Sequence, residues 1–199
     1  MPKASLALSA MAFAALASAA IAAPNPNPAE APAGHYVLDH RHTSLSASVL
    51  HMGLSHFTVR IEQAEGSYDY DPKNPQASMI SITLDAHSLN AGDPSVSKEF
   101  AGEFLDADKH PQITFTSTAI MPTDTNHGTV TGDLTFRGVT KPVSLDVTYN
   151  GYASNLILGR RMGFSATTVI KRSDFGSKAW LGDVGDDVRV VIETEFARK

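Results

Sequence analysis

Apolar and polar residues alternate with a period of two along most of the chain beyond residue 35. In the segment 143–149, VSLDVTY, every second residue is apolar and the residues between are polar. Successive side chains of a strand point to opposite faces, so this period predicts strands with one buried and one wet face. The same alternation occurs at 45–51, 80–85, 113–116, 130–136 and 188–195, and together with less regular segments near 57–70 and 160–171 it predicts about eight strands.

Turn-forming sequences separate these predicted strands. They include Asp71–Pro75, Asn126–Gly128, Gly138–Pro142 and Asn150-Gly151. Short connections of this kind favour antiparallel pairing of consecutive strands. Eight antiparallel strands with one apolar face form either a sandwich or a closed barrel, and an eight-stranded barrel leaves room for one ligand. Periodicity alone leaves both architectures open.

One segment departs from the period of two. Asp93-Pro94 is typical of a helix start, and Val96, Phe100 and Phe104 then recur at four-residue spacing. The pattern predicts a short helix near residues 94–105, and the alternative is a loop packed over one end of the sheet. In either case we expect the two phenylalanines to cap the interior.

The N-terminal part of the chain divides into two segments. Residues 1–22 hold one cation, an Ala-rich apolar stretch and a small-residue cleavage motif at Ala20 and Ala22, which predicts a secretory signal peptide rather than a retained anchor. Residues 23–34, APNPNPAEAPAG, hold no large apolar side chain and predict a flexible Pro-rich segment. A single barrel or sandwich domain is expected over residues 35–199.

Composition narrows the function classes. The formal charge is −5, and loss of Lys3 with the leader makes it −6, which disfavours a nucleic-acid or anionic-membrane surface. The chain has no cysteine, which excludes a thiol nucleophile, a thiolate zinc site and covalent haem attachment. A Gly-x-Ser-x-Gly elbow is also missing from the sequence, and we expect no catalytic residues and no enzyme activity.

Several longer motifs resemble the bacterial YceI-like family. They are Leu38–Thr43, His51–Gly53, Asp108–Phe115, Gly132–Pro142, Gly163–Ala166 and Lys171–Gly176, in order across residues 36–196. The resemblance implies an all-β, eight-stranded antiparallel lipocalin-like barrel that lies in the periplasm and encloses a polyisoprenoid chain. Members are described as isoprenoid- or quinone-binding, and some bind other long amphiphiles. Between Ser88 and Phe104 the chain departs from many members, with Ser97–Ala101 in place of an Arg-Asp-x-His-Leu motif, so the headgroup contacts are left open.

The apolar faces supply the predicted lumen of such a barrel. We expect the lipid to contact the inward side chains of the strands together with the two phenylalanines of the helix. His42 and Arg172 match family motifs and are the candidates for headgroup contacts. The predicted lumen residues are Leu45, Val49, His51, Ile80, Ile82, Leu84, Phe100, Phe104, Phe115, Leu134, Phe136, Leu145, Val147, Phe164 and Val190.

Histidines and a few other polar residues admit two interpretations each. His40, His42, His51 and His56 raise the hypothesis of a zinc or copper site, but hydrogen bonds with partners such as Asp39 explain them better, and we expect no metal. An inward His51 contacts a headgroup or ties two strands together. For Arg172 a local pair with Asp174 is expected, and Trp180 with Phe175 either flanks the barrel mouth or anchors a long loop.

The sequence therefore predicts a periplasmic carrier for a long-chain apolar lipid such as a quinone or isoprenoid phosphate, with no other cofactor. One alternative is a binder of another long amphiphile, such as a fatty amide in a stress response. Another is an accessory domain that presents a quinone to a membrane electron-transfer complex, which would involve a transient membrane or cytochrome partner. The oligomeric state stays open at this point.

Overall fold

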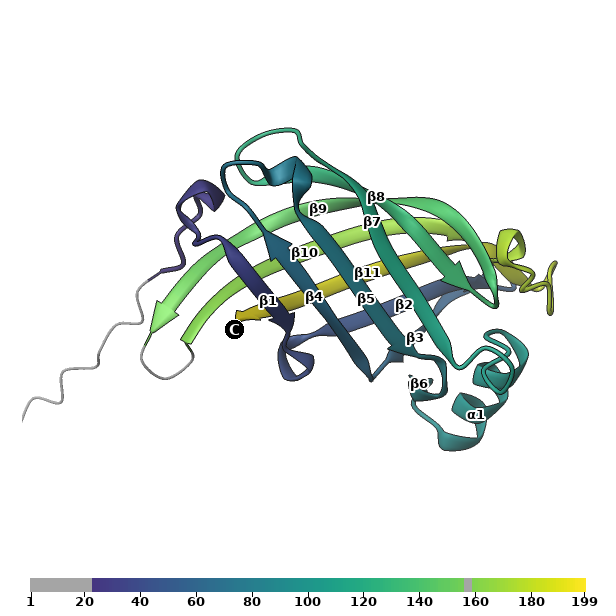
Figure 1. Ribbon diagram of the computed structural model, residues 1–199. Helices are drawn as coiled ribbons and strands as arrows, with labels where there is room; N and C mark the ends of the chain where they lie inside the picture. Colours follow the sequence, from purple (N-terminus) through teal and green to yellow (C-terminus); the bar gives the residue numbers. More distant parts are fainter. Residues whose placement is uncertain (1–22, 156–158) are drawn as a thin grey trace, which may run out of the picture.

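The computed structural model describes residues 23–155 and 159–199 (Figure 1). The predicted signal peptide, residues 1–22, lies outside the described residues. Within them the chain folds into one antiparallel sheet that curves into a barrel. Its strands are β1 (Gly34–Leu38), β2 (Ser44–His51), β3 (Ser55–Ile61), β4 (Ala64–Tyr70), β5 (Met79–Asp85), β6 (Leu89–Asn90), β7 (Gln112–Pro122), β8 (His127–Phe136), β9 (Val139–Asn155), β10 (Gly159–Lys171) and β11 (Val184–Arg198).

The sheet closes because its last strand pairs with its first. The strand order β1-β4-β5-β7-β8-β9-β10-β11 returns to β1 through pairs such as Tyr36 with Arg198. β11 also pairs with β2, which pairs with β3, and β3 pairs with β6. Thus β1 and β2, β3 and β4, and β5 and β6 are each one long strand interrupted by a short irregular segment. Counted this way the barrel has eight strands, which confirms the prediction and excludes the sandwich.

Two of these interruptions begin at aspartates. Asp39 accepts a hydrogen bond from the Arg41 backbone N–H before the 3₁₀ turn η2 (His40–His42). Asp85 does the same for His87 before η4 (Ala86–Ser88). Such side-chain caps compete with ladder hydrogen bonds, and this explains why the strands break at these positions.

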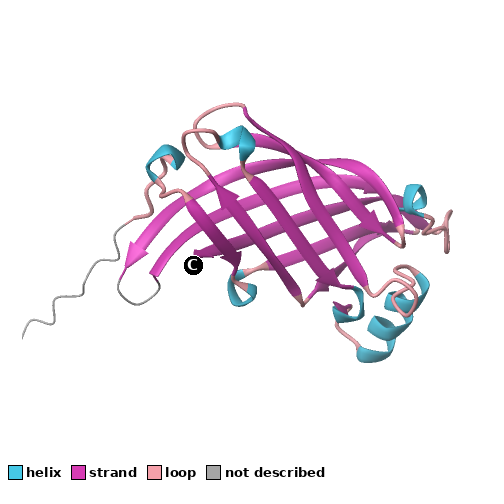
Figure 2. Ribbon diagram, in the orientation of Figure 1, coloured by secondary structure: helices cyan, strands magenta, loops and turns pink. Residues whose placement is uncertain are grey.

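The predicted helix is confirmed as α1 (Pro94–Glu103), at one end of the barrel (Figure 2). The Asp93 carboxylate accepts hydrogen bonds from the backbone N–H groups of Ser95 and Val96, and proline occupies the first helical position. Phe100 packs edge-on against Phe57 of β3, with ring centroids 5.4 Å apart. The helix is thereby attached to the barrel wall by its aromatic side chains. No helix in the described ranges is long and apolar enough to cross a membrane.

The N-terminal segment differs from the expectation of a flexible tether. The 3₁₀ turn η1 (Pro28–Glu30) lies against the barrel, and Ala31 after it is buried. The Tyr70 hydroxyl donates to the Pro28 carbonyl at 2.7 Å, and that of Tyr36 donates to the Pro32 carbonyl at 2.6 Å. Buried tyrosine hydroxyls need acceptors, and the carbonyls of an irregular Pro-rich segment are free to accept. These long-range contacts order a segment that has no large apolar side chain.

Two clusters of buried residues support the wall. One lies beneath the N-terminal segment and is rich in aromatic rings, with Tyr36, Tyr68, Tyr70, Tyr149 and Phe196 among its members. The other lies beneath α1 and is built mainly from small and aliphatic side chains: Ile61, Ala86, Leu89, Ala101 and Ala107. Between the clusters the interior of the barrel is hollow.

Candidate functional site

A cavity of about 760 Å³ occupies the barrel interior. Residues from every part of the wall line it, from Leu45 of β2 to Phe196 of β11, together with Phe100 and Phe104 of the helical segment. Its volume lies in the upper part of the usual range for small-molecule sites, roughly 300–1,000 Å³. The barrel is therefore a container and its centre is not a packed core.

All fifteen residues predicted for the lumen line this cavity. The reason is the pleat: Leu145 and Val147 of β9 face inward, whereas their neighbours Ser144 and Asp146 are exposed. Whether these side chains contact a lipid stays a prediction. The set is the following: Leu45, Val49, His51, Ile80, Ile82, Leu84, Phe100, Phe104, Phe115, Leu134, Phe136, Leu145, Val147, Phe164 and Val190.

Other lining residues come from segments where the sequence pattern is weaker. Phe57, Tyr68, Tyr70 and Met162 all border the cavity. The sequence nevertheless alternates around them: polar Thr58 separates Phe57 from the inward Val59, and Asp69 separates Tyr68 from Tyr70. The alternation within the segments 57–70 and 160–171 is the sequence signal that marks these residues as inward-facing.

Tyrosines dominate the cavity end beneath the N-terminal segment. Residues Asn27, Pro28 and Ala29 of that segment also reach the cavity. Burial raises the pKa values of Tyr68 and Tyr149 well above the ordinary tyrosine value. Both phenols therefore stay neutral at physiological pH, and this end of the cavity carries no tyrosinate charge.

The opposite end of the cavity lies between α1 and the β2–β3 hairpin. Phe57, Phe100 and Phe104 stand around it, and the ring of Phe104 packs edge-on against that of Phe100 at 5.1 Å. His51 lines the same end. Its ring makes no hydrogen bond within the described part of the chain, so the strand-tying bond considered for His51 is not present.

Arg172 borders the cavity but is only 3% exposed. Burial lowers its pKa from the ordinary arginine value. Its guanidinium lies 5.4 Å from the centroid of the Phe104 ring. The expected pair with Asp174 is wrong, because Asp174 pairs instead with Lys141 at 3.4 Å. The guanidinium donates at 2.7–3.0 Å to backbone carbonyls of Ser177, Ala179, Val184 and Gly185.

These four bonds give Arg172 a clear structural task. They attach the loop between η5 (Arg172–Phe175) and β11, and the first residues of β11, to the end of β10 and satisfy four backbone carbonyls. Four of the five guanidinium N–H groups are consumed in this way. A headgroup contact through Arg172 is limited to the remaining N–H on Nη2.

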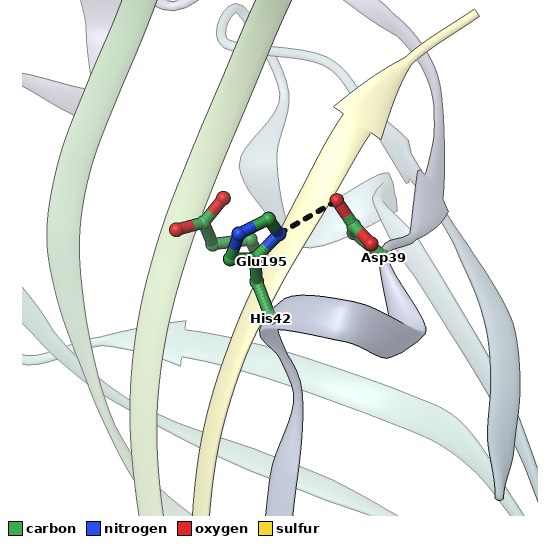
Figure 3. A group of neighbouring side chains, drawn as sticks. All are labelled: Asp39, His42 and Glu195. Carbon is green, nitrogen blue, oxygen red and sulfur yellow. Dashed lines mark hydrogen bonds and ion pairs between the residues drawn. The ribbon is translucent and has the colours of Figure 1, made fainter. Parts of the chain in front are cut away.

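His42 does not line the cavity, so its position gives no support to a headgroup role. Its exposed ring lies on the outer surface, where Nδ1 is 2.9 Å from an Asp39 carboxylate oxygen (Figure 3). His42 is the last residue of the 3₁₀ turn η2, before β2 begins at Ser44, and it therefore lies outside the inward register of β2.

Asp39, His42 and Glu195 form a group with metal-ligand chemistry (Figure 3). However, the Arg161 guanidinium binds Asp39 and also lies 3.2 Å from Glu195. The hydrogen bond from Arg161 holds the pKa of the Asp39 carboxyl far below its ordinary range. The Arg161 guanidinium between the two carboxylates makes the cluster an ion-pair network. Of the four histidines, His42 alone makes the expected side-chain hydrogen bond within the described residues.

A closed antiparallel barrel around a long apolar cavity defines a lipocalin-like container protein. Comparison of the sequence with family models is consistent with this class: residues 36–196 match the YceI-like domain. The chain belongs to the YceI-like family.

Curated relatives cover most of the chain. A UPF0312 protein of Pseudomonas putida (strain GB-1) is 37% identical over 152 residues, which span 75% of this chain and 79% of the relative. Protein YceI of Shigella flexneri is 33% identical over 168 residues, spanning 83% of this chain and 87% of that protein.

Solved structures share the barrel. BcnA of Burkholderia cenocepacia superimposes with a TM-score of 0.70 at 28% identity, covering 79% of this chain and 98% of BcnA. A polyisoprenoid binding domain from Saccharophagus degradans, implicated in plant cell wall breakdown, gives a TM-score of 0.65 at 13% identity and covers 84% of this chain and 100% of that domain. At that identity the likeness concerns the fold alone.

Proposed function

We propose that this protein is a periplasmic carrier that encloses a polyisoprenoid-type lipid in its barrel. The observation that carries the proposal is the cavity of about 760 Å³ with apolar side chains along its whole length. Membership of the YceI-like family supports it, as does the fold shared with a domain described as polyisoprenoid-binding.

The size of the cavity suits a tail of several isoprene units. At roughly 30 Å³ per non-hydrogen atom, the share of one water molecule in the liquid, it holds on the order of 25 such atoms. This corresponds to about five units of five carbons. A longer chain would extend beyond the ends of the barrel.

Energetics also favour a long tail over a short one. Burial of one methylene contributes roughly 0.8 kcal/mol, so about 25 carbons contribute on the order of 20 kcal/mol. Association costs on the order of 4–15 kcal/mol. A tail of two units contributes about 8 kcal/mol and leaves little surplus, whereas one that fills the cavity binds firmly.

The cavity favours a cargo with a small or neutral polar end. The tyrosines at one end are neutral, and most of the Arg172 donors at the other are used by backbone carbonyls. A neutral quinone fits this environment better than an isoprenoid diphosphate, because a buried diphosphate needs several free cationic donors. The proposal is of a binding protein, and the absence of enzyme activity stays a prediction.

The direct test is the composition of material purified from its own periplasm. We expect an intact mass for a chain that starts at Ala23 and, in the organic extract, a stoichiometric lipid with an apolar tail of at least about four isoprene units. Protein retained in membranes at full length would contradict the periplasmic assignment. An extract without stoichiometric lipid, or with only a short amphiphile, would contradict the carrier function.

A further inference from the structure

Large apolar side chains are exposed at one end of the barrel, the end that holds α1. Leu54 is 82% exposed, and Met52 and Trp180 are each 58% exposed. Leu50 and Leu181 are exposed close to them in sequence. None of these five side chains lines the cavity, so they neither fill the core nor contact an enclosed cargo. We call the five residues the apolar rim.

Hydrogen bonds join the segments that carry the apolar rim. The backbone N–H of Met52, in the β2–β3 hairpin, donates to the Asp183 carbonyl at 2.6 Å. The indole N–H of Trp180 donates to the Glu103 carboxylate at the end of α1 at 2.7 Å. Hairpin, loop and helix therefore meet at one end, on the right in Figure 1. Phe57 lies in β3, just after the turn of the hairpin, and it lines the cavity. The rim therefore surrounds this cavity end.

Backbone conformation indicates that Met52 is not there for stability. Met52 and Gly53 are the two central residues of the turn His51–Leu54, with φ values of 50° and 69°, and the Leu54 N–H donates to the His51 carbonyl at 2.9 Å. A turn with both central residues in the left-handed region strongly favours Asn or Asp before glycine. Methionine at this position adopts an unfavourable backbone conformation and exposes an apolar side chain to water. Trp180, with a φ of 55°, combines the same two costs.

The other end of the barrel has a cover and a more polar border. It is covered by the N-terminal segment, and its cavity border includes polar residues such as Asn27, Asp124 and Asn126. Two exposed methionines lie toward that end, Met79 at the start of β5 and Met121 near the end of β7. The two barrel ends therefore face different surroundings.

We propose that the apolar rim docks on the surface of a lipid bilayer and that the cargo enters and leaves through the end that it surrounds. This proposal builds on the lipid-carrier function, because a bilayer is where an apolar cargo resides. Continuity of the rim with the cavity supports a lipid partner, since the cargo would pass from acyl chains to Phe57 without crossing water. Tryptophan and leucine at convex turn tips suit insertion into a deformable interface. The hairpin residues 51–56 carry no carboxylate, whereas Glu103 and Asp183 bring two exposed carboxylates to the loop side of the rim, so the proposed surface is one of neutral lipid.

The chain provides its own probe for this docking, because Trp180 is its only tryptophan. Purified protein is titrated with phosphatidylcholine vesicles while the tryptophan emission is recorded. We expect a blue shift as the exposed indole leaves water, and quenching when the vesicles contain brominated acyl chains. Neutral vesicles are used because the rim offers apolar side chains rather than a basic patch.

A matched pair of double variants locates the surface. Met52→Asn with Leu54→Ser removes two apolar side chains from the rim, and Met79→Ser with Met121→Thr removes two from the other end. We expect the rim variant to need at least about tenfold more lipid for the half-maximal shift, since each side chain loses burial energy of the kind that sets such partitioning. The control variant should titrate like the wild type. Met52→Asn alone should raise the melting temperature while it weakens docking, because Asn tolerates the left-handed turn.

Three results would overturn the proposal: no shift in the wild type, equal binding by the two double variants, or a blue shift that depends on protein concentration alone. The last would make the rim an interface between copies, and sedimentation would show a dimer that the rim variant abolishes. The carrier function is judged separately by the organic extract. Docking without extracted lipid would remove the carrier function, and with it the cargo route, but would leave the docking surface. Extracted lipid without docking would remove only this proposal.

Discussion

Asp39 shows how a single residue on the outer surface can stabilise the barrel. Its backbone lies at the break between β1 and β2, where the Asp39 N–H donates to the Glu195 carbonyl of β11. Its carboxylate accepts from Arg161 of β10 and from the Arg41 backbone N–H. The residue therefore connects the broken strand to its neighbours in the sheet. The Asp39 and Arg161 side chains are mostly buried, so solvent screens this pair less than a surface pair.

Replacement of Asp39 by Asn should lower the free energy of unfolding by about 1.5–3 kcal/mol at pH 7, the usual contribution of hydrogen bonds to charged groups. Arg161 lowers the pKa of Asp39 in the folded state. The stabilisation is thus complete above the unfolded pKa of about 4 and is lost as the pH falls further, toward the folded value. Urea unfolding of wild type and variant at several pH values measures the difference.

A matched control is Asp187→Asn, which breaks an exposed ion pair with Lys171. It should change stability little at any pH. A loss for Asp39→Asn that is small at pH 7, or that does not shrink in acid, would contradict the assigned role of the Arg161 contact.

For Arg172 the sequence indicated the position of the side chain but not its hydrogen-bond partners. Its motif, and its position next to the inward face of β10, could be found in the sequence. Its partners could not, because they are backbone carbonyls of the loop before β11 and of the first two residues of β11, which only the folded chain brings near. The sequence shows a nearby carboxylate at Asp174, but the geometry of η5 directs that carboxylate to Lys141 instead.

At the scale of elements, the N-terminal segment is the clearest departure from the sequence-based expectation. Composition correctly indicates that the segment cannot order itself. It gives no information about the tyrosines of β1 and β4, whose hydroxyls need the carbonyls of Pro28 and Pro32. In addition, Asn25 and Tyr152 exchange backbone hydrogen bonds at 2.8 and 2.9 Å and attach the segment to β9. The segment acts as a cover over the tyrosine end of the cavity.

The double variant Tyr36→Phe, Tyr70→Phe should release this cover. Each hydroxyl lost removes a hydrogen bond worth about 1 kcal/mol while it leaves the ring packed. We expect faster hydrogen exchange and proteolysis within residues 25–33, with little change in the barrel amides. Tyr152→Phe serves as a control, since its contact with Asn25 is made by the backbone. Equal protection of residues 25–33 in the double variant and the wild type would contradict the cover.

The strands and the helix were predicted correctly because their signals lie in the local sequence. Alternation in a strand and an Asp-Pro helix start are local signals, and tertiary contacts reinforce them here. The interruptions of three strands were not predicted, because a side-chain cap at Asp39 or Asp85 is weak evidence against the apolar pattern that continues on either side. Local signals thus predicted the number of strands but not their continuity.

For the whole molecule, closure is the decisive property. Pairing of β1 with β11 removes the sheet edges and surrounds a space that the inward side chains do not fill. The period of two could not decide this, because a sandwich uses the same pattern with two sheets packed face to face. The resemblance to the YceI-like family favoured the barrel over the sandwich. The strand order explains why the barrel closes, because β11 pairs with β1. The inward residues follow from closure and alternation together.

The variant Leu145→Trp tests whether the hollow interior of the barrel holds a lipid. Leu145 lies within β9 on the cavity side, and its outward neighbour Asp146 supplies the control Asp146→Trp. An added indole inside a packed core would cost typically 1–3 kcal/mol. Inside a cavity of about 760 Å³ the same indole takes space from the ligand instead.

Native mass spectra of the purified proteins, recorded beside melts of the delipidated forms, give the answer. We expect a lipid adduct on the wild type and on Asp146→Trp, no adduct on Leu145→Trp, and a melting temperature of delipidated Leu145→Trp close to that of the wild type. An adduct retained on Leu145→Trp, or a wild type without an adduct together with a steep fall in the Leu145→Trp melt, would contradict this expectation.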